Sequence, residues 1–243
     1  DIFGYPSEMN RFEEIAAARG LGLLEDSAQA LGAIDPQGRK VGSRGNLAVF
    51  AFYANKQMTT GEGGMLIPRS ADEASQIRSE RNQGRSTDMS WLEHDRLGFN
   101  YRLSDIAAAV GVAQVERLDS ILAARAASAD TYARHLAQIE GLELPQPGSG
   151  ECHRSWFVYP VRLPESTDRD AVIGKLAEQG IPAKAYLPAI HLLPHLRDLG
   201  YSPGMFPVTE AVAERSLALP FYAGLSDSDA DRVASALKTA ITG

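Results

Sequence analysis

The chain has 243 residues, of which 44% are hydrophobic and 23% charged, a composition typical of an ordinary globular protein with one or two domains. A net charge of −7 argues against a general binder of nucleic acids or anionic membranes, and no apolar run approaches membrane-spanning length or resembles a signal peptide. A single cysteine, Cys152, excludes an internal disulfide and favours a reducing, cytoplasmic setting.

The first part of the chain alternates a helix with short apolar runs. Residues 1–4 resemble the tail of a strand, and residues 7–19 place apolar side chains at helical spacing. The apolar runs at 21–26 and 47–53 predict buried strands, and a turn rich in glycine leads to a third strand at 65–67. A helix followed by a strand predicts an α/β fold with a mostly parallel sheet.

Helical patterns continue toward a proline-rich boundary. Residues 70–80 predict a polar helix, and residues 104–139 keep helical spacing over a length that predicts a bend or break. The segment 144–150 is rich in proline and glycine, which is typical of a linker. We therefore expect one domain over residues 1–143 and a smaller one over residues 144–243.

The region after this boundary alternates strands and helices. This pattern predicts a small α+β domain of the kind that covers a cleft. The expected strands are 156–163, 181–187 and 217–219, and the expected helices are 168–179, 209–216 and 226–241.

Lys56 is the first candidate for chemistry. It follows the most apolar strand of the chain, so its amine is expected near apolar walls at a strand end. Desolvation lowers the pKa of a lysine and frees its lone pair for a carbonyl carbon, as a Schiff-base lysine requires. The alternative is a strand-end lysine whose ammonium group reaches water, which is commoner among lysines in general.

Asp26 is the second candidate, because it ends the strand that precedes the lysine strand. Ligand groups gather where the strands of open α/β sheets end, so the Asp26 and Lys56 side chains are expected near each other. A pyridine-ring cofactor needs such a pair, an amine for its aldehyde and a carboxylate for its ring nitrogen.

Two further patterns concern anions and metals. Arg81 and Arg85 flank a short turn, where arginines favour an anion clamp, although a solvated basic turn explains them equally well. His191 and His195 have a spacing that on a helix could hold zinc, but Pro194 interrupts a regular helix between them and no third ligand stands nearby. We therefore expect no metal site.

The lysine strand and its turn carry a family resemblance. The runs Tyr53-Ala-Asn-Lys56 and Thr60-Gly-Glu-Gly-Gly-Met65, with the acidic pair Glu25-Asp26, resemble the sugar aminotransferases of the DegT/DnrJ/EryC1/StrS family, most of all its perosamine-synthase branch. The resemblance covers nearly the whole chain. It implies the fold of type I transferases dependent on pyridoxal 5'-phosphate (PLP), the aspartate aminotransferase-like fold, with part of the large domain's sheet and a small C-terminal domain.

The resemblance also implies roles for four residues at the cofactor. Lys56 would bind the cofactor aldehyde, Asp26 would keep the ring nitrogen protonated, and Gln29 would donate a hydrogen bond to the ring oxygen. Without the resemblance, Gln29 is better explained as a capping or solvated glutamine. Asn100, in the signature Asn100-Tyr101-Arg102, would reach the cofactor phosphate of a neighbouring subunit, which implies a homodimer with shared sites.

The implied reaction is transamination of a nucleotide-linked keto-sugar, a 4-keto-6-deoxyhexose at the level of the branch, with an amino acid such as glutamate as donor. Arg81 is a substrate-binding candidate, and the resemblance places Tyr186 and His191 in a loop near the sugar. A structural loop histidine explains His191 equally well. A related PLP-dependent sugar dehydratase carries histidine at the lysine position, so Lys56 argues against that reaction.

Two features depart from the family pattern. Ala51 stands where the family usually has a serine that binds the cofactor phosphate, a loss of one hydrogen bond worth about 1 kcal/mol. The resemblance also places residues 1–4 well inside a longer enzyme, whose upstream part carries a phosphate-binding turn and an aromatic that stacks on the cofactor. The alternative to an enzyme is a catalytically incomplete remnant or a scaffold subunit of a sugar-biosynthesis assembly.

Overall fold

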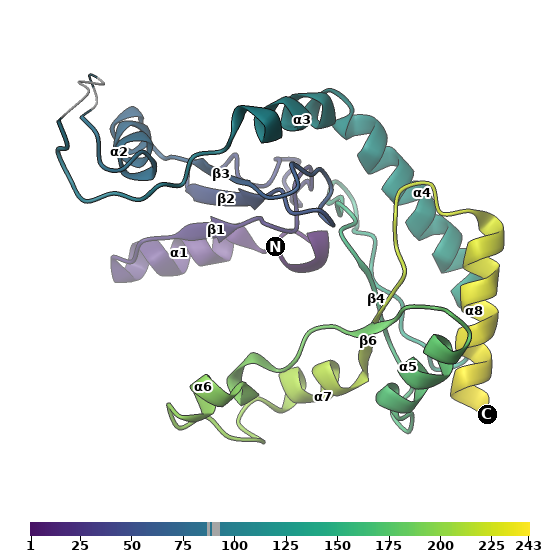
Figure 1. Cartoon of the computed structure of the whole chain (residues 1–243). Helices are drawn as coiled ribbons and strands as arrows, with labels where there is room; N and C mark the ends of the chain where they lie inside the picture. Colours follow the sequence, from purple (N-terminus) through teal and green to yellow (C-terminus); the bar gives the residue numbers. More distant parts are fainter. Residues whose placement is uncertain (87, 89–92) are drawn as a thin grey trace. The chain divides into compact units, whose positions relative to one another are not determined.

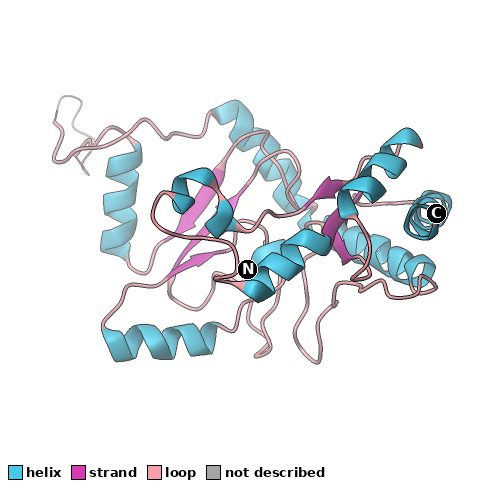
Figure 2. Cartoon of the chain, turned by 90° about the horizontal axis from the view of Figure 1, so that it is seen from below, coloured by secondary structure: helices cyan, strands magenta, loops and turns pink. Residues whose placement is uncertain are grey.

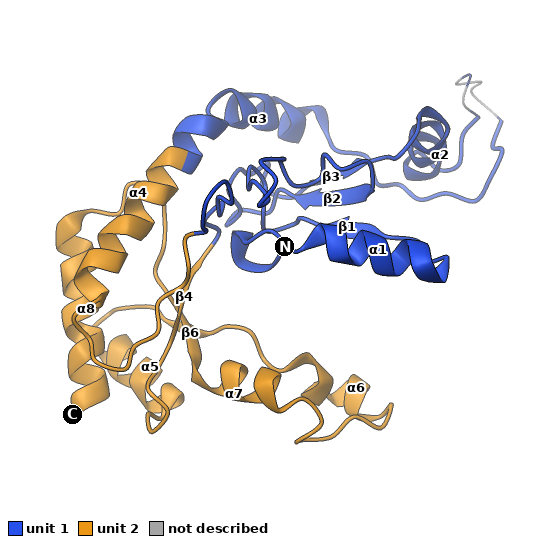
Figure 3. Ribbon diagram, turned by 180° about the vertical axis from the view of Figure 1, so that it is seen from behind, with its two compact units in different colours: residues 1–122, 148–157 blue, residues 123–147, 158–243 orange. Residues whose placement is uncertain are grey.

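The computed structural model describes residues 1–86, 88 and 93–243, and these form two compact units. The first unit contains residues 1–122 and 148–157, and the second contains residues 123–147 and 158–243 (Figure 3). The segment 148–157 belongs to the first unit because its backbone is hydrogen-bonded there, for example from the His153 N–H to the Ile34 carbonyl at 2.9 Å. The domain division at residue 144 stays a prediction.

The first unit is built on a three-stranded sheet in the order β1-β2-β3 (Figure 1). Strands β1 (Leu24–Asp26) and β2 (Leu47–Ala51) pair in parallel, as the α/β prediction requires. Strand β3 (Gly64–Ile67) is antiparallel to β2, because the glycine turn reverses the chain and a parallel pairing would need a longer crossover. The expected mostly parallel sheet is therefore mixed in the part that this chain supplies.

Helices α1 (Met9–Arg19), α2 (Ala71–Arg81) and α3 (Asp105–Glu116) belong to this unit, and α1 runs beside β1 (Figures 1 and 3). Helix α2 begins after Ser70, whose hydroxyl accepts a hydrogen bond from the Glu73 N–H. The expectation of a strand tail at the start of the chain is wrong. Ile2–Gly4 form a single 3-10 turn, η1, closed by a hydrogen bond from the Tyr5 N–H to the Ile2 carbonyl.

The expected break in the long helical region is confirmed. Helix α3 ends at Glu116, and α4 (Leu118–Leu136) begins after Arg117, whose φ of −104° and ψ of 2° depart from helical values. Helix α4 carries the chain from the first unit into the second.

The second unit contains an antiparallel sheet in the order β4-β6-β5 together with helices, which confirms the α+β prediction for this region (Figure 2). Pro194 begins a helix, at the position where its missing N–H costs nothing, so His191 and His195 lie on separate helical turns. The elements are β4 (Tyr159–Arg162), α5 (Arg169–Glu178), β5 (Lys184–Ala185), η2 (Ile190–Leu192), α6 (Pro194–Arg197), α7 (Pro207–Arg215), β6 (Ser216–Leu219) and α8 (Asp227–Thr242).

Each unit has its own apolar core. In the first unit Phe50 and Phe52 continue from β2 into a buried cluster with Val41 and Met58, and this cluster supports the turn that carries Lys56. The fully buried large side chains of the second unit are Tyr132, Leu136, Tyr159, Val161, Leu163, Val172, Leu176, Leu217 and Leu237.

No helix among residues 1–86, 88 and 93–243 has both the length and the apolar composition that a membrane crossing requires. Within the same residues, no three His, Cys, Asp or Glu side chains are grouped so that they could hold a metal ion.

Candidate active site

The turn that carries Lys56 is closed by hydrogen bonds at its base. The Phe52 N–H donates to the Gly63 carbonyl at 2.8 Å, and the Thr60 N–H donates to the Phe52 carbonyl at 2.9 Å. Inside the turn, the Lys56 N–H donates to the Tyr53 carbonyl at 3.0 Å. The backbone of Lys56 is therefore fixed although the turn lies beyond the end of the sheet.

Gln57 anchors the same turn from inside the unit. Its side chain is 3% exposed, and its Nε2 donates to the Gln29 carbonyl at 2.6 Å and to the Ser155 carbonyl and hydroxyl, both at 3.0 Å. A buried amide with several partners is costly to disturb, because each partner would be left without a hydrogen bond. Gln57 thus joins the lysine turn to two other segments of the unit.

The Lys56 amine lies against an aromatic ring in a partly buried position. Its Nζ is 4.3 Å from the centroid of the Phe157 ring. Burial lowers the pKa of Lys56, and the Asp26 charge acts in the opposite direction without cancelling the effect of burial. A lowered pKa increases the neutral fraction of the amine, and the neutral amine is the form that attacks a carbonyl carbon.

Strand β1 presents two carboxylates on opposite faces, since successive side chains of a strand alternate. Glu25 is buried, and its Oε1 accepts a hydrogen bond from the Gly42 N–H at 3.0 Å. Asp26 is exposed, accepts from the Ala28 N–H at 3.1 Å, and is the carboxylate whose charge reaches Lys56. The strand therefore gives one carboxylate to the structure and leaves the other available to a ligand.

Gln29 belongs to the same cluster. Its Oε1 accepts a hydrogen bond from the Phe3 N–H at 2.7 Å, and its carbonyl accepts from Gln57. With the oxygen held in this way, the amide nitrogen is the end of the side chain left to donate to a ligand. Lys56, Asp26 and Gln29 thus form one group, which we call the lysine cluster.

Arg81 and Asn100 lie together in the same unit, in a second group. The Tyr101 N–H donates to the Arg81 carbonyl at 2.8 Å, and Asn100 forms a β-bridge with Asn82. None of the contacts described for these residues reaches the lysine cluster. The predicted reach of Asn100 into a neighbouring subunit stays a prediction.

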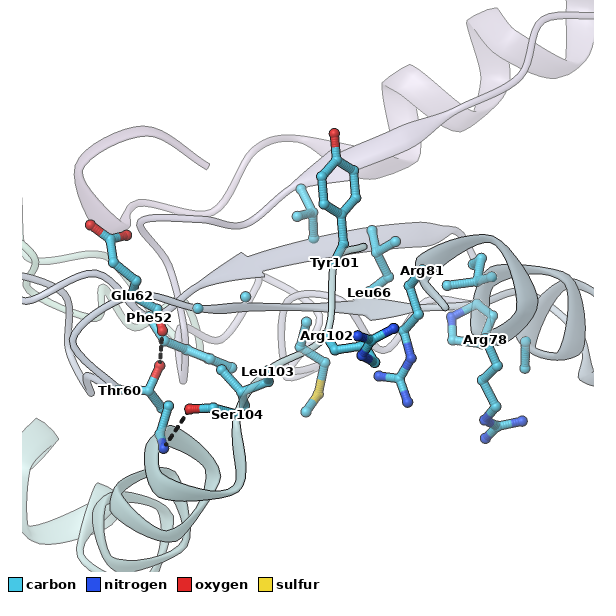
Figure 4. Close-up of a pocket in the computed structure, with 18 residues that line it drawn as sticks. Phe52, Thr60, Glu62, Leu66, Arg78, Arg81, Tyr101, Arg102, Leu103 and Ser104 are labelled. Carbon is cyan, nitrogen blue, oxygen red and sulfur yellow. Dashed lines mark hydrogen bonds between the residues drawn. The ribbon is translucent and has the colours of Figure 1, made fainter. Parts of the chain in front are cut away.

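A groove of about 1060 Å³ ends beside Arg81 (Figure 4). One end is lined by Thr60 and Glu62 of the turn after the lysine, and the other end by arginines of α2 and by Arg102. Apolar side chains of β3 and its neighbours, including Leu66 and Leu103, line the middle. The groove therefore combines an apolar wall with a cationic end.

The two remaining substrate-binding candidates belong to the second unit. His191 is 7% exposed, its Nε2 lies 3.0 Å from Glu210 Oε1, and its ring packs edge-on against Phe206 at 4.8 Å between centroids. These contacts give His191 a structural role, which was the alternative explanation for it. Burial raises the pKa of Tyr186. For both residues, a contact with substrate stays a prediction.

The lysine cluster fits part of PLP. It offers an amine of lowered pKa for the aldehyde, a carboxylate for the ring nitrogen and an amide donor for the ring oxygen. Ala51, the last residue of β2, presents only a methyl group, so it supplies no side-chain hydrogen bond to a phosphate. Donors for the cofactor phosphate must therefore come from outside this cluster.

Sequence analysis missed three residues that shape the cluster, namely Gln57, Ser155 and Phe157. Gln57 adjoins Lys56, yet nothing in a single sequence distinguishes a buried anchoring glutamine from a solvated one. Ser155 and Phe157 follow Lys56 by about a hundred residues and come after the segment expected to be a linker. Their contacts depend on the return of residues 148–157 to the first unit, which no local pattern indicates.

Solved structures identify the fold. DesV of S. venezuelae matches with a TM-score of 0.89 and 31% identity, over 100% of this chain and 64% of that chain. PseC of Helicobacter pylori, an aminotransferase involved in the biosynthesis of pseudoaminic acid, has a TM-score of 0.91 at 23% identity, over 99% of this chain and 65% of that chain, and supports the fold alone. The fold is therefore that of the type I PLP-dependent aminotransferases.

The family follows from the sequence match. The model of the DegT/DnrJ/EryC1/StrS aminotransferase family matches residues 1–238, and the chain belongs to this family. It is 38% identical over 239 residues to the GDP-perosamine synthase of Caulobacter vibrioides, covering 97% of this chain and 63% of the relative. It is 32% identical over 253 residues to the UDP-N-acetyl-3-dehydro-alpha-D-glucosamine 3-aminotransferase of Acidithiobacillus ferrooxidans, covering 100% of this chain and 63% of that protein. The chain thus spans a little under two thirds of the length of these relatives.

Proposed function

We propose that this chain is part of an enzyme that uses PLP to move an amino group from an amino acid, such as glutamate, to a nucleotide-linked keto-sugar. The observation that carries the proposal is the Lys56 amine, which has a lowered pKa, lies under the influence of Asp26 and rests on Phe157. Family membership supports it, because the relatives include enzymes named for amino-sugar synthesis.

The chemistry that PLP supplies when bound is an electron-withdrawing ring that makes a neighbouring carbon–hydrogen bond acidic. Lys56 would hold the cofactor through its Nζ and would take and return a proton as general base, for which a lowered pKa is suited. The Asp26 carboxylate would hold a proton at the ring nitrogen. The Gln29 amide nitrogen would donate a hydrogen bond to the ring oxygen.

A 4-keto-6-deoxyhexose is the proposed sugar, on the strength of the similarity to a GDP-perosamine synthase. Tyr186 and His191 are proposed near the sugar, and Arg81 near an anionic group of the substrate. Asn100 is proposed to complete the cofactor site of a second copy, so that the working form is a homodimer. The free, buried Cys152 supports the proposal of a reducing, cytoplasmic setting.

The test of the lysine cluster is to add PLP to the full-length enzyme of which this chain is a part, and to measure the visible absorbance that appears when a lysine binds the PLP aldehyde. We expect the band in the unchanged chain and in Lys238→Ala, a control that removes an exposed lysine from α8. We expect Lys56→Ala to lose the band. An unchanged band in Lys56→Ala would contradict the assignment.

Transfer of the amino group is tested by incubating the protein with PLP, glutamate and a panel of nucleotide keto-sugars, and by measuring the masses of the products by mass spectrometry. A gain of an amino group on one member of the panel supports the proposal. A sedimentation run that shows only monomer at micromolar concentration would contradict the shared site.

A second candidate is a catalytically incomplete remnant or scaffold subunit. Ala51 favours it, because the methyl group removes a phosphate donor that the family usually has. The two candidates differ in the absorbance test: a scaffold binds no PLP at Lys56, whereas the enzyme does so and loses the binding in Lys56→Ala.

A further inference from the structure

Phe3 has a backbone conformation that bulky residues rarely adopt. Its φ of 57° and ψ of 19° lie in the left-handed region, in the middle of the turn η1 (Ile2–Gly4). In this region the Cβ atom comes too close to the following carbonyl oxygen, a contact that glycine avoids. Such a conformation persists only where the surrounding structure holds it, and strained residues of this kind gather at functional sites.

Hydrogen bonds hold both of the peptide groups that flank Phe3. On one side, the Phe3 N–H donates to Gln29 Oε1 at 2.7 Å. On the other side, the Phe3 carbonyl accepts from Arg154 Nε at 3.0 Å. Because φ and ψ of a residue set the relative orientation of these two peptide groups, the two bonds together hold Phe3 in the left-handed region.

Arg154 is held in place by an aromatic ring. Its guanidinium carbon lies 4.5 Å from the centroid of the Trp156 ring, and the Trp156 side chain is buried. A guanidinium group stacks well on an aromatic face and is attracted by it. The stacking restricts the rotation of the Arg154 side chain, so its Nε stays directed at the Phe3 carbonyl.

A simpler explanation is that Arg154 only attaches the segment 148–157 to the first unit. That attachment is made by other bonds. The backbones of Ile34 and His153 exchange two hydrogen bonds, both at 2.9 Å, within the same unit. The bond from Arg154 goes to Phe3 instead, and it therefore acts on the strained turn.

The Phe3 N–H determines the orientation of the Gln29 amide. A backbone N–H can only donate, so it selects the amide oxygen and leaves the amide nitrogen as the end that can donate to a ligand. If Phe3 relaxed to an ordinary backbone conformation, its N–H would turn away from Gln29 and this selection would be lost.

We propose that Arg154 is a positioning residue for the lysine cluster and acts on Gln29 through the backbone of Phe3. Arg154 holds the Phe3 carbonyl, the Phe3 N–H holds the Gln29 oxygen, and the Gln29 nitrogen stays free to donate to the ring oxygen of PLP. The inference rests on the proposed function for this acceptor. The hold of Arg154 on Phe3 concerns the protein without cofactor and can be measured separately.

The test compares arginine variants of the full-length enzyme of which this chain is a part. Arg154→Met removes the donor to Phe3 and keeps a long, apolar side chain that can cover Trp156. The matched control, Arg169→Met, removes another partly buried arginine that donates to a backbone carbonyl, that of Ala213 in the second unit. Arg154→Lys keeps the positive charge and one donor group.

Without PLP, the measurement is hydrogen–deuterium exchange of backbone N–H groups. We expect residues 2–5 to exchange about tenfold faster or more in Arg154→Met, because a hydrogen bond from a charged group is lost, and to be unchanged in the control. Ile34 and His153 are expected to keep their protection. The proposal is overturned if residues 2–5 exchange at the same rate in Arg154→Met as in the unchanged enzyme. It is overturned too if Ile34 and His153 lose protection equally, because Arg154 then only attaches its own segment.

With PLP, the measurement is the dissociation constant from titration of the visible band, in a double-mutant cycle with Gln29→Met. We expect Arg154→Met alone to weaken PLP binding about 3- to 10-fold, Arg154→Lys to weaken it less, and Arg169→Met to leave it unchanged. In the Gln29→Met background, Arg154→Met is expected to have little further effect, because both changes remove the same hydrogen bond to the ring oxygen. An equal loss in both backgrounds would overturn the proposal.

The two measurements separate this proposal from the proposed function. An enzyme that binds no PLP contradicts the proposed function and overturns the role of Gln29 at the ring oxygen, whereas faster exchange of residues 2–5 in Arg154→Met still supports the hold on Phe3. Normal PLP binding together with unchanged exchange in Arg154→Met overturns the role of Arg154 alone.

Discussion

The contact between Lys56 and Phe157 predicts how the reactivity of the amine can be changed without changing the lysine itself. An aromatic ring face stabilises an ammonium group over the neutral amine, and Nζ lies 4.3 Å from the ring centroid. Phe157→Leu removes the ring face but keeps an apolar side chain at this buried position, so most of the desolvation is retained. Removing the favourable contact with the charged form lowers the pKa of Lys56 further below its ordinary value.

The size of the effect follows from the strength of such contacts. A lysine near an aromatic face gains about 0.5 kcal/mol when exposed and about 2 kcal/mol when desolvated. Lys56 is partly buried, so its gain lies between these limits. Loss of the contact therefore raises the neutral fraction of Lys56 about 2- to 30-fold at a pH below its pKa.

Competitive labelling measures this fraction directly. A trace of acetic anhydride reacts with neutral amines, and peptide mass spectrometry gives the labelling of Lys56 relative to that of the exposed Lys238 at each pH. The control is Phe50→Leu, which removes a buried ring from the core cluster of the same unit. We expect faster labelling of Lys56 in Phe157→Leu than in Phe50→Leu.

Two outcomes would refute this reasoning. If Phe157→Leu slows the labelling of Lys56, the ring acts mainly by excluding water and not by binding the ammonium group. If Phe50→Leu and Phe157→Leu change the labelling equally, the effect comes from loosening of the unit and not from the contact.

Two further predictions concern stability. The side chains of Asp35 and Arg44 are 3% and 1% exposed, and Asp35 Oδ2 lies 2.6 Å from Arg44 Nη1. We therefore expect Asp35→Ala to lower the free energy of unfolding in urea by about 3–5 kcal/mol. The unaffected control is Asp72→Ala, on the surface of α2. Burial raises the pKa of Asp35, but the hydrogen bonds from backbone N–H groups and from Arg44 outweigh burial and lower this pKa. The stability that Asp35 contributes is therefore present above the ordinary pKa of an aspartate and is lost as pH falls through the lowered pKa. A urea midpoint that does not change in acid would contradict this prediction. Glu210 accepts from the Gly204 N–H at 2.8 Å and pairs with His191, so Glu210→Gln is expected to speed protease cleavage between residues 198 and 206, and an unchanged cleavage rate would show that the loop is held by other contacts.

The positions of Lys56 and Asp26 could be predicted because each depends on a local pattern. A short apolar run predicts a strand, and a polar residue at its end lies where strands of α/β sheets present ligand groups. The break between α3 and α4 was predictable for a similar reason, since a helical pattern of that length rarely stays regular.

The environment of Lys56 could not be predicted in the same way. Phe157 reaches the amine because the chain returns to the first unit after residue 147, through hydrogen bonds such as that between the Ser155 N–H and the Gly4 carbonyl. The prolines and glycines of residues 144–150 predict a linker, but the chain after residue 147 packs in the first unit instead of leading directly into the second. The strand β3 was predicted at residues 65–67, but its antiparallel direction was not, because the apolar pattern indicates only that a strand forms there.

The lysine cluster shows how a partly exposed side chain can still be held in place. Each of its two candidate residues adjoins a buried polar residue whose side chain makes structural hydrogen bonds. Gln57 follows Lys56 and donates to the Ser155 carbonyl, and Glu25 precedes Asp26 and accepts from the Gly42 N–H. The structural bonds therefore fix the backbone of the reactive residues without occupying the amine or the carboxylate that a ligand would need. The backbone geometry of the cluster is therefore expected to depend on the two anchors, Gln57 and Glu25, more than on Lys56 and Asp26 themselves.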